Sequence, residues 1–284
     1  MSLFITSLNS GSNGNCYYIG NATEAILIDA GLPCKELELR MQRLGLKMEM
    51  IRAVFVSHEH TDHISGIPTL LKRYKIPVFI TPSTLRNGKL RFDASLINHF
   101  SPYQPVTIGG LQITGFPKFH DACDPHSFIV SNGRVNIGIF TDIGRPCDHV
   151  TAHFSKCHAA FLESNYDEVM LSQGRYPAFL KNRITCGKGH LSNTQALDIF
   201  LKYRPSYMSH LLLSHLSKEN NRPEIVDELF TRYAGNTTVI VATRFSETPV
   251  YEISTGGMLA PAPVIPAPVQ VPAPVQIYSQ MTLF

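Results

Sequence analysis

Residues 51–63 read Ile-Arg-Ala-Val-Phe-Val-Ser-His-Glu-His-Thr-Asp-His, an apolar run followed by a cluster of polar side chains. The first seven residues form a β-branched and aromatic run, which predicts a buried strand. Four potential metal ligands follow directly, namely His58, His60, Asp62 and His63. Imidazole and carboxylate groups together suit divalent zinc, iron or manganese. The stretch predicts a metal site at a strand end, with a solvated polar loop as the alternative.

The chain on either side of this stretch alternates between strand and helix patterns. An amphipathic helix is expected from Ile64 to Tyr74, and residues 24–29 predict a short buried strand. Two more helices carry capping-box signals, one with Ser192 and Gln195 and one with Asn221 and Glu224. Further strands are predicted by apolar runs at 111–116, 127–131, 135–140, 159–163, 211–214 and 238–242. This alternation predicts a layered α/β domain.

Composition excludes several classes of protein. The net charge of +3 is too small to indicate a nucleic-acid-binding protein by itself. No apolar run approaches the roughly 18 residues of a transmembrane helix, and no signal-peptide pattern opens the chain. Six cysteines without a C-x-x-C pair fit reduced thiols. We therefore expect a cytoplasmic protein with no membrane partner.

The ligand pattern resembles the first metal motif of the metallo-β-lactamase superfamily, H-x-H-x-D-H after a strand. The resemblance implies an αββα four-layer sandwich within the α/β class. It also implies that three downstream residues complete the ligand set, namely His120, Asp142 and His215. Each of the three follows an apolar, strand-like run, which would bring all the ligands to one edge of the sheets.

Two divalent metal ions per chain, zinc or alternatively manganese, are the cofactors that this ligand set implies. Such a pair lowers the pKa of a bridging water, orients the resulting hydroxide for attack and compensates the charge that develops on the substrate. Asp62 is expected to serve the catalytic centre as well as to bind metal. Asp29, at the end of its strand, is expected to fix the tautomer of a ligand histidine, with a helix N-cap as the alternative.

Two further residues favour phosphodiester chemistry. Glu163 and His190 lie between Asp142 and His215, an order similar to RNase Z-like phosphodiesterases. In those enzymes such a histidine, paired with a glutamate, approaches the scissile phosphate and assists the leaving group. A contact at the start of a helix is the alternative for His190.

Over residues 1–255 the chain most closely resembles the YycJ/WalJ subfamily of metallo-β-lactamase-fold proteins. The matching segments are 10–15, 58–66, 120–122, 163–165, 189–193 and 215–221. The resemblance implies a DNA exonuclease. Tyr166 departs from the histidine expected after Glu-Ser-Asn, which puts one substrate contact in doubt and leaves the metal ligands untouched.

Several polar residues are candidates for contacts with a phosphate. The loop at residues 10–15 would offer backbone N–H groups, with a tight turn between strands as the alternative. Lys181, Arg183 and Arg222 would add cations, although a solvated position is the alternative for each. The candidate substrate contacts are Ser12, Asn13, Asn15, Lys218 and Asn220.

The C-terminal segment differs in composition from the rest of the chain. Residues 256–279 are uncharged and rich in Pro, Ala and Val, which predicts an extended linker. The chain then ends in Gln280, Met281, Thr282, Leu283 and Phe284, which resembles the peptide that binds the bacterial sliding clamp. A tethered peptide of this kind would recruit the enzyme to the clamp, with a tail that has no partner as the alternative.

These features predict a dinuclear phosphodiesterase that acts on DNA. A hydrolase of small thioesters or lactones is the alternative within the fold, and a narrow apolar pocket would distinguish it. A clamp-bound adaptor with vestigial metals is the third hypothesis, but no residue of the five metal motifs is missing.

Overall fold

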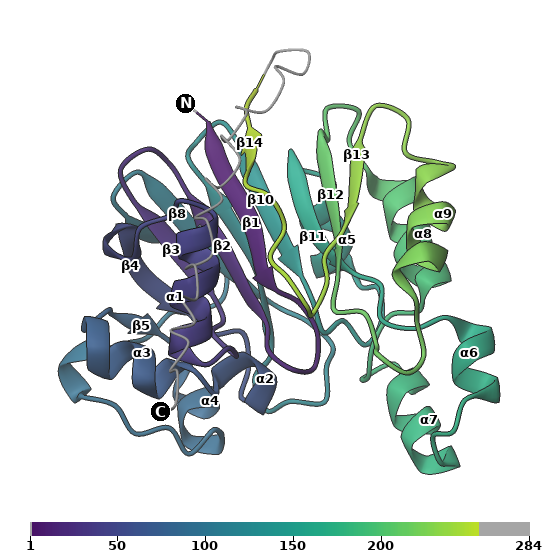
Figure 1. Ribbon diagram of the computed structural model, residues 1–284, viewed down its shortest axis with the longest axis horizontal. Coiled ribbons are helices and arrows are strands. Elements are labelled where there is room, and N and C mark those ends of the chain that lie inside the picture. The colour runs from purple at the N-terminus through teal and green to yellow at the C-terminus, as the bar shows by residue number, and fades with distance from the viewer. Residues whose placement is uncertain (1, 256–284) are drawn as a thin grey trace, which may run out of the picture.

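Two seven-stranded sheets form the centre of the computed structural model, which describes residues 2–255. The first sheet has the order β14-β1-β2-β3-β4-β5-β6 and the second the order β13-β12-β11-β10-β9-β8-β7 (Figure 1). The strands of the first sheet are β1 (Leu3–Asn9), β2 (Cys16–Gly20), β3 (Ala25–Ile28), β4 (Ile51–Phe55), β5 (Val78–Phe79), β6 (Ile97–Asn98) and β14 (Tyr251–Ile253). Those of the second are β7 (Val106–Ile108), β8 (Leu111–Pro117), β9 (His126–Ser131), β10 (Asn136–Phe140), β11 (Ala159–Glu163), β12 (His210–Ser214) and β13 (Thr238–Val241).

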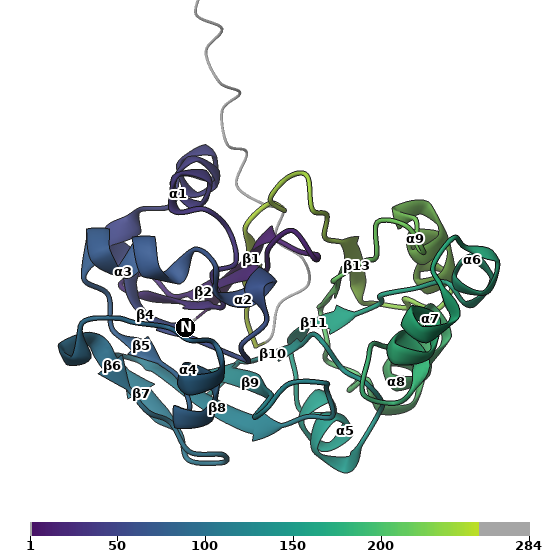
Figure 2. The same cartoon turned by 90° about the horizontal axis from the view of Figure 1, so that it is seen from below.

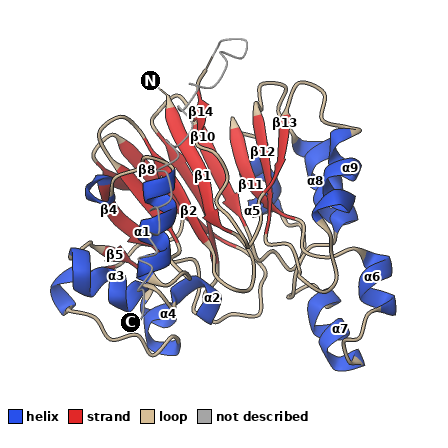
Figure 3. Cartoon of the chain, in the orientation of Figure 1, coloured by secondary structure: helices blue, strands red, loops and turns tan. Residues whose placement is uncertain are grey.

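Helices cover the outer face of each sheet, as Figure 3 shows by colour. Those beside the first sheet are α1 (Cys34–Arg43), α2 (Thr61–Ile64), α3 (Ile67–Tyr74) and α4 (Pro82–Asn87). Those beside the second sheet are α5 (Asp148–Phe154), α8 (Asn193–Tyr203) and α9 (Pro223–Thr231), while α6 (Glu168–Gln173) and α7 (Ala178–Thr185) lie below them in Figure 1. Short 3₁₀ turns occupy Met48–Met50 and Ala94–Leu96. This αββα arrangement confirms the fold class expected from the sequence.

Three apolar cores hold the four layers together. Residues that alternate along a strand enter different cores, because successive side chains point to opposite faces of a sheet. In β3, Ile26 and Ile28 join the core between the two sheets, whereas Ala25 and Leu27 pack towards the helices. A third core lies between the second sheet and α5, α8 and α9. Both sheets are therefore buried on their two faces, which explains why their strands read as continuous apolar runs.

Parallel strands bring the polar segments of interest to one edge of the molecule. β3, β4 and β5 run parallel in the first sheet, and β10, β11, β12 and β13 run parallel in the second. The loops that follow these strands therefore meet at the carboxyl ends. Figure 2 looks onto this edge, with α2 and α7 on either side of the strand ends.

The helix expected from Ile64 to Tyr74 is not continuous. It is divided into α2 and α3, with Ser65 and Gly66 between them. A Cβ atom on Gly66 would lie only 1.7 Å from the carbonyl oxygen of Leu32, so only glycine, which has no side chain, fits at this position. The break results from this tertiary contact, which the helical periodicity of the sequence does not reveal.

The two predicted capping boxes have different outcomes. The box of Ser192 and Gln195 is present at the start of α8. The box of Asn221 and Glu224 is wrong, because α9 begins at Pro223 with no side-chain cap. The side-chain Nδ2 atom of Asn221 instead donates to the carbonyl oxygen of Ser164 at 2.9 Å, which connects this segment to the end of β11.

Within residues 2–255, no helix has the length and apolar character needed to cross a membrane. The linker at 256–279 and the candidate clamp peptide at 280–284 lie outside the described residues.

Candidate metal centre

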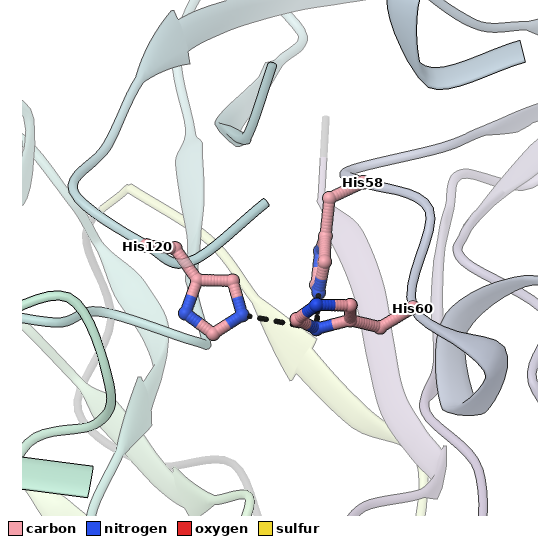
Figure 4. Close-up of side chains that lie close together, drawn as sticks. All are labelled: His58, His60 and His120. Atoms are coloured by element: carbon pink, nitrogen blue, oxygen red, sulfur yellow. Dashed lines mark hydrogen bonds between the residues drawn. The ribbon is translucent and has the colours of Figure 1, made fainter. Parts of the chain in front are cut away.

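Three histidines form the first group of potential ligands. His58 follows β4, His60 precedes α2, and His120 follows β8. The Nε2 atom of His58 lies 3.1 Å from Nδ1 of His60, and Nε2 of His120 lies 3.2 Å from the same atom. Figure 4 shows the three rings converging on one point. Burial lowers the pKa of His58 well below its ordinary value and that of His120 to about 3, which leaves both rings neutral and able to bind a cation.

A second group consists of Asp62, His63 and His215. Their ligand atoms lie within 4.8 Å of one another, with Oδ2 of Asp62 3.4 Å from Nε2 of His215. Burial alone would lower the pKa of His63, but the nearby carboxylates outweigh it and raise the value well above normal. The pKa of His215 rises to about 10 by the same balance. The carboxylates of this group therefore attract positive charge, which is what a divalent ion supplies.

Asp142 lies between the two groups. Its Oδ2 atom is 3.1 Å from Nε2 of His63. Its Oδ1 atom is 3.5 Å from Nδ1 of His215 and 3.8 Å from Nε2 of His120. Oδ2 is buried and makes no hydrogen bond of suitable geometry. Although burial raises the pKa of this carboxyl group, the surrounding histidines hold it well below normal. A buried, ionised oxygen without a donor fits a cation ligand.

Four of the five histidines have a hydrogen-bond partner on Nδ1. The partners are the Ser57 hydroxyl for His58, the Asp29 carboxylate for His63, the Gly189 carbonyl oxygen for His120 and the Glu163 carboxylate for His215. Such partners fix the tautomer, so that the other nitrogen presents its lone pair to the centre. The donor set as a whole therefore fits two divalent cations.

Asp29 makes three hydrogen-bonding contacts with its two carboxylate oxygens. Its Oδ2 atom lies 2.7 Å from Nδ1 of His63 and accepts from the Ser57 hydroxyl at 2.7 Å, while Oδ1 accepts from the Ser57 amide at 2.8 Å. α1 begins after Pro33 without a side-chain cap, so Asp29 does not act as its N-cap. Sequence reasoning missed Ser57, which has no ligand-like chemistry of its own.

Left-handed backbone places three of these side chains. Asp29, Asp142 and His215 have φ values of 60°, 55° and 56°, and each follows a strand. Residues other than glycine adopt this conformation at a cost of about 1 kcal/mol or more, which the surrounding structure must offset. The His215 amide donates to the Ser10 hydroxyl at 2.7 Å, which helps to hold the turn.

Glu163 connects His215 to a further histidine. Its Oε1 atom lies 2.7 Å from Nδ1 of His190 and 3.0 Å from Nδ1 of His215, while Oε2 accepts from the amides of Ile143 and Leu191. Burial would raise the pKa of Glu163, but the contacts with His190 and His215 lower it to about 2. The carboxylate is therefore charged and keeps His190 oriented.

A cavity of about 400 Å³ opens onto these groups. Asp62, Asp142, His190 and His215 line its base, and most of the other lining residues are polar. Tyr176 and three residues of α7, Leu180, Arg183 and Ile184, form one wall. Sequence reasoning missed this wall, because none of the α7 residues is buried and the helix lacks an amphipathic pattern.

The five candidate substrate contacts lie in different places. Ser12 lines the cavity, and Asn13 is exposed and donates to the Arg244 carbonyl oxygen. Asn15 is buried, with its amide nitrogen 3.1 Å from Asp62 Oδ2 and 3.1 Å from His63 Nε2. Lys218 is exposed and Asn220 is buried, and neither lines the cavity.

The other residues in question lie around the same edge. Tyr166 is buried and does not line the cavity. Lys181 donates to the Ser172 carbonyl oxygen, and Arg183 lines the cavity but forms an ion pair with Asp121 at 2.5 Å. Sequence reasoning also missed Lys118, whose buried ammonium group donates to the Thr141 carbonyl oxygen at 2.6 Å, next to Asp142.

Comparisons with known proteins agree with this geometry. Residues 10–179 match the model of the metallo-beta-lactamase superfamily. The chain is 32% identical over 230 residues to exodeoxyribonuclease YycJ of Bacillus anthracis, covering 79% of this chain and 86% of that protein. It is 30% identical over 223 residues to exodeoxyribonuclease WalJ of Streptococcus pneumoniae, covering 77% and 83%. The structure of the metallo-beta-lactamase fold protein YhfI from Bacillus subtilis superposes with a TM-score of 0.69 at 18% identity, over 89% of this chain and all of that one.

Proposed function

Since the chain belongs to the metallo-β-lactamase superfamily and, within it, to the YycJ/WalJ subfamily, we propose that it is a metal-dependent phosphodiesterase that acts on DNA as an exonuclease. One observation carries the proposal. Two groups of ligand side chains converge on Asp142, and His190, which pairs with the buried Glu163, lines the same cavity. A charged phosphodiester needs both cationic compensation and a proton for the departing oxygen, and this arrangement offers both.

We assign the first group, His58, His60 and His120, to one divalent ion. The second ion would be held by Asp62, His63 and His215, with Asp142 between the two sites. When bound, such ions activate a water at neutral pH and compensate the negative charge that develops on the phosphate. Zinc suits these imidazole and carboxylate ligands, and manganese is the alternative.

The remaining polar side chains would orient the ligands and move one proton. Asp29 would hold His63 in the tautomer that exposes Nε2, and Asn15 would hold Asp62 by its amide. Glu163 would hold the His190 ring in place through its contact with Nδ1. His190 would then donate its proton to the oxygen that leaves the phosphorus atom.

The residues that line the cavity favour this substrate over a small apolar ester. Most of them are polar, and three aliphatic side chains contribute, Leu180, Ile184 and Leu216. A hydrolase of thioesters or lactones would need an apolar surface for the acyl group.

The test of the catalytic proposal uses purified protein and end-labelled single- and double-stranded DNA, with zinc or manganese. We expect metal-dependent release of nucleotides that His60→Ala abolishes. His149→Ala is the matched control, because His149 is exposed on α5 and its Nδ1 atom lies 2.9 Å from the Tyr103 hydroxyl, not among the ligands. A metal-loaded protein that leaves every DNA intact but cleaves a thioester or a lactone would replace this proposal with the alternative.

A second proposal concerns recruitment. The terminal residues Gln280, Met281, Leu283 and Phe284 match a sliding-clamp-binding peptide, and the Pro-rich segment 256–279 would act as its tether. The full chain should bind a purified bacterial clamp, and the double variant Leu283→Ala, Phe284→Ala should not. Equal binding by both proteins would remove the clamp from the proposal and leave the catalytic part unchanged.

A further inference from the structure

A half-buried arginine lies beside the cavity that holds the candidate metal ligands. Arg244 belongs to the loop that connects β13 to β14. Two contacts fix the backbone of this loop against the loop between β1 and β2. Asn13 donates from Nδ2 to the carbonyl oxygen of Arg244 at 3.1 Å, and the Ser10 amide donates to the carbonyl oxygen of Thr243 at 3.3 Å.

The guanidinium group of Arg244 is held in one orientation. Its Nη2 atom donates to the Leu216 carbonyl oxygen at 2.9 Å, and Nη1 and Nη2 lie 3.4 Å and 3.5 Å from the Ser12 hydroxyl. Gly11 leaves room for this group, since a Cβ atom there would lie 3.0 Å from Nη2. The φ of Gly11 is +137°, which also favours glycine. The donors of Arg244 are therefore in place before any ligand arrives.

Arg244 forms no ion pair with a carboxylate of the described residues, although Glu219 and Asp62 are near enough to interact with its charge. Among residues 2–255, no carboxylate oxygen lies within 4.0 Å of its guanidinium nitrogens, whereas Arg40, Arg43 and Arg183 each have such a partner. Burial lowers the pKa of Arg244. The group nevertheless stays charged near neutral pH, because an arginine ordinarily loses its proton only above about pH 12. An anion would complete the coordination of this cation.

The position of Arg244 indicates which anion it would meet. Ser12 and Leu216, its two partners, line the cavity that also contains Asp62 and His215. Arg244 itself does not line the cavity but contacts these two lining residues. The scissile phosphate is expected at the metal ligands, so an anion bound by Arg244 would lie beside it.

We propose that Arg244 and the Ser12 hydroxyl form a second phosphate subsite, which binds a phosphate next to the scissile one in a nucleic-acid chain. The planar guanidinium fork matches a phosphate, and the hydroxyl can donate to the same oxygen. The inference rests on the proposed function and adds a basis for substrate selection. A phosphodiester with a single phosphorus atom cannot use the subsite, whereas an oligonucleotide can.

The test compares Arg244→Gln with the wild-type enzyme on two substrates, an oligodeoxynucleotide and bis(4-nitrophenyl) phosphate. Loss of one charged hydrogen-bonding group should raise KM for the oligonucleotide about tenfold or more and change kcat little. The change in KM for bis(4-nitrophenyl) phosphate should be much smaller. Ser12→Ala should shift KM in the same direction by a smaller factor. Arg134→Gln is the charge-matched control, because Arg134 is exposed in the turn before β10, at the opposite end of that strand from Asp142.

Binding gives a readout that does not depend on turnover. The affinity of metal-free protein for the oligonucleotide should fall less steeply with salt in Arg244→Gln, by a slope of about one, while Arg134→Gln keeps the wild-type slope. Arg244→Lys tests the role of the planar guanidinium group, because it retains the charge. This variant should have the wild-type salt slope, and its KM should lie between those of the wild-type enzyme and Arg244→Gln. If the wild-type enzyme cleaves the oligonucleotide and Arg244→Gln has the same KM and salt slope, the subsite is wrong and the proposed function stands. If the wild-type enzyme cleaves no DNA, the proposed function fails and the subsite fails with it.

Discussion

The Oε1 atom of Glu163 lies 2.7 Å from Nδ1 of His190, so the ring donates this N–H and has Nε2 left for the cavity. The same carboxylate is buried and charged, with a pKa of about 2. The Glu163 carboxylate therefore holds the His190 ring in one orientation. In the proposed function His190 would deliver a proton to a group in the cavity, and this role can be separated from metal binding.

His190→Ala should lower kcat on DNA by about 100-fold or more, because general acid catalysis contributes at least that much to comparable reactions. Bis(4-nitrophenyl) phosphate should be affected much less, since 4-nitrophenolate leaves without a proton. The metal content, measured by mass spectrometry, should stay at the wild-type level. An equal loss of kcat on both substrates would contradict the role in leaving-group protonation.

Asp29→Asn should weaken metal binding by about 10- to 100-fold, because it removes the charge that orients His63 and accepts its Nδ1 proton. The measurement is competition with a chelator of known affinity. Asp198→Asn is the matched control, since Asp198 is exposed on α8 and pairs with Lys202. Wild-type metal affinity in Asp29→Asn would show that Asp29 serves packing alone.

Gly66→Ala should lower the free energy of unfolding by at least about 2 kcal/mol, because the new methyl group would meet the Leu32 carbonyl oxygen at 1.7 Å. Urea denaturation gives the value. Gly110→Ala is the control, since its Cβ would approach only the ends of the Glu24 and Asn21 side chains, at 3.3 Å and 3.6 Å. Equal stabilities of the two variants would mean that the loop between α2 and α3 can move away from Leu32.

The metal-free protein should become less stable as the pH rises from about 7 towards 10. His63 and His215 have raised pKa values in the folded chain, about 10 for His215, so their protonated forms stabilise the fold below the pKa of an unfolded histidine. That contribution is lost as the pH passes through the folded pKa. In the metal-loaded protein His63 and His215 would bind metal in place of the additional proton, so its stability should not decline in this way. Urea denaturation in chelator and in zinc gives the free energy of unfolding of the metal-free and the metal-loaded protein. The same dependence of this free energy on pH in both would contradict the prediction.

The local part of the site could be predicted from the sequence because its ligands are neighbours along the chain. His58, His60, Asp62 and His63 follow one strand, and the strand-end positions of Asp142 and His215 were visible as polar residues after apolar runs. The αββα layering followed from the same alternation together with the family resemblance. These features depend on short-range pattern, which a sequence displays directly.

Features that arise from contacts between distant segments could not be predicted in this way. The break at Gly66 depends on Leu32, and the orientation of His58 depends on Ser57, whose hydroxyl in turn donates to Asp29. Arg244 contacts Ser12, which lines the cavity, across more than 200 residues of sequence. Neither Ser57 nor Arg244 belongs to a pattern of its own, because each acquires its role only when the sheets bring the loops together.

The most direct measurement is the release of labelled nucleotides from DNA while metal-free protein is titrated with zinc. Two ligand groups that share Asp142 predict no release without metal, a rise as zinc is added, and a plateau at two equivalents per chain. Release by the metal-free protein in chelator, or a plateau at one equivalent, would contradict a dinuclear phosphodiesterase.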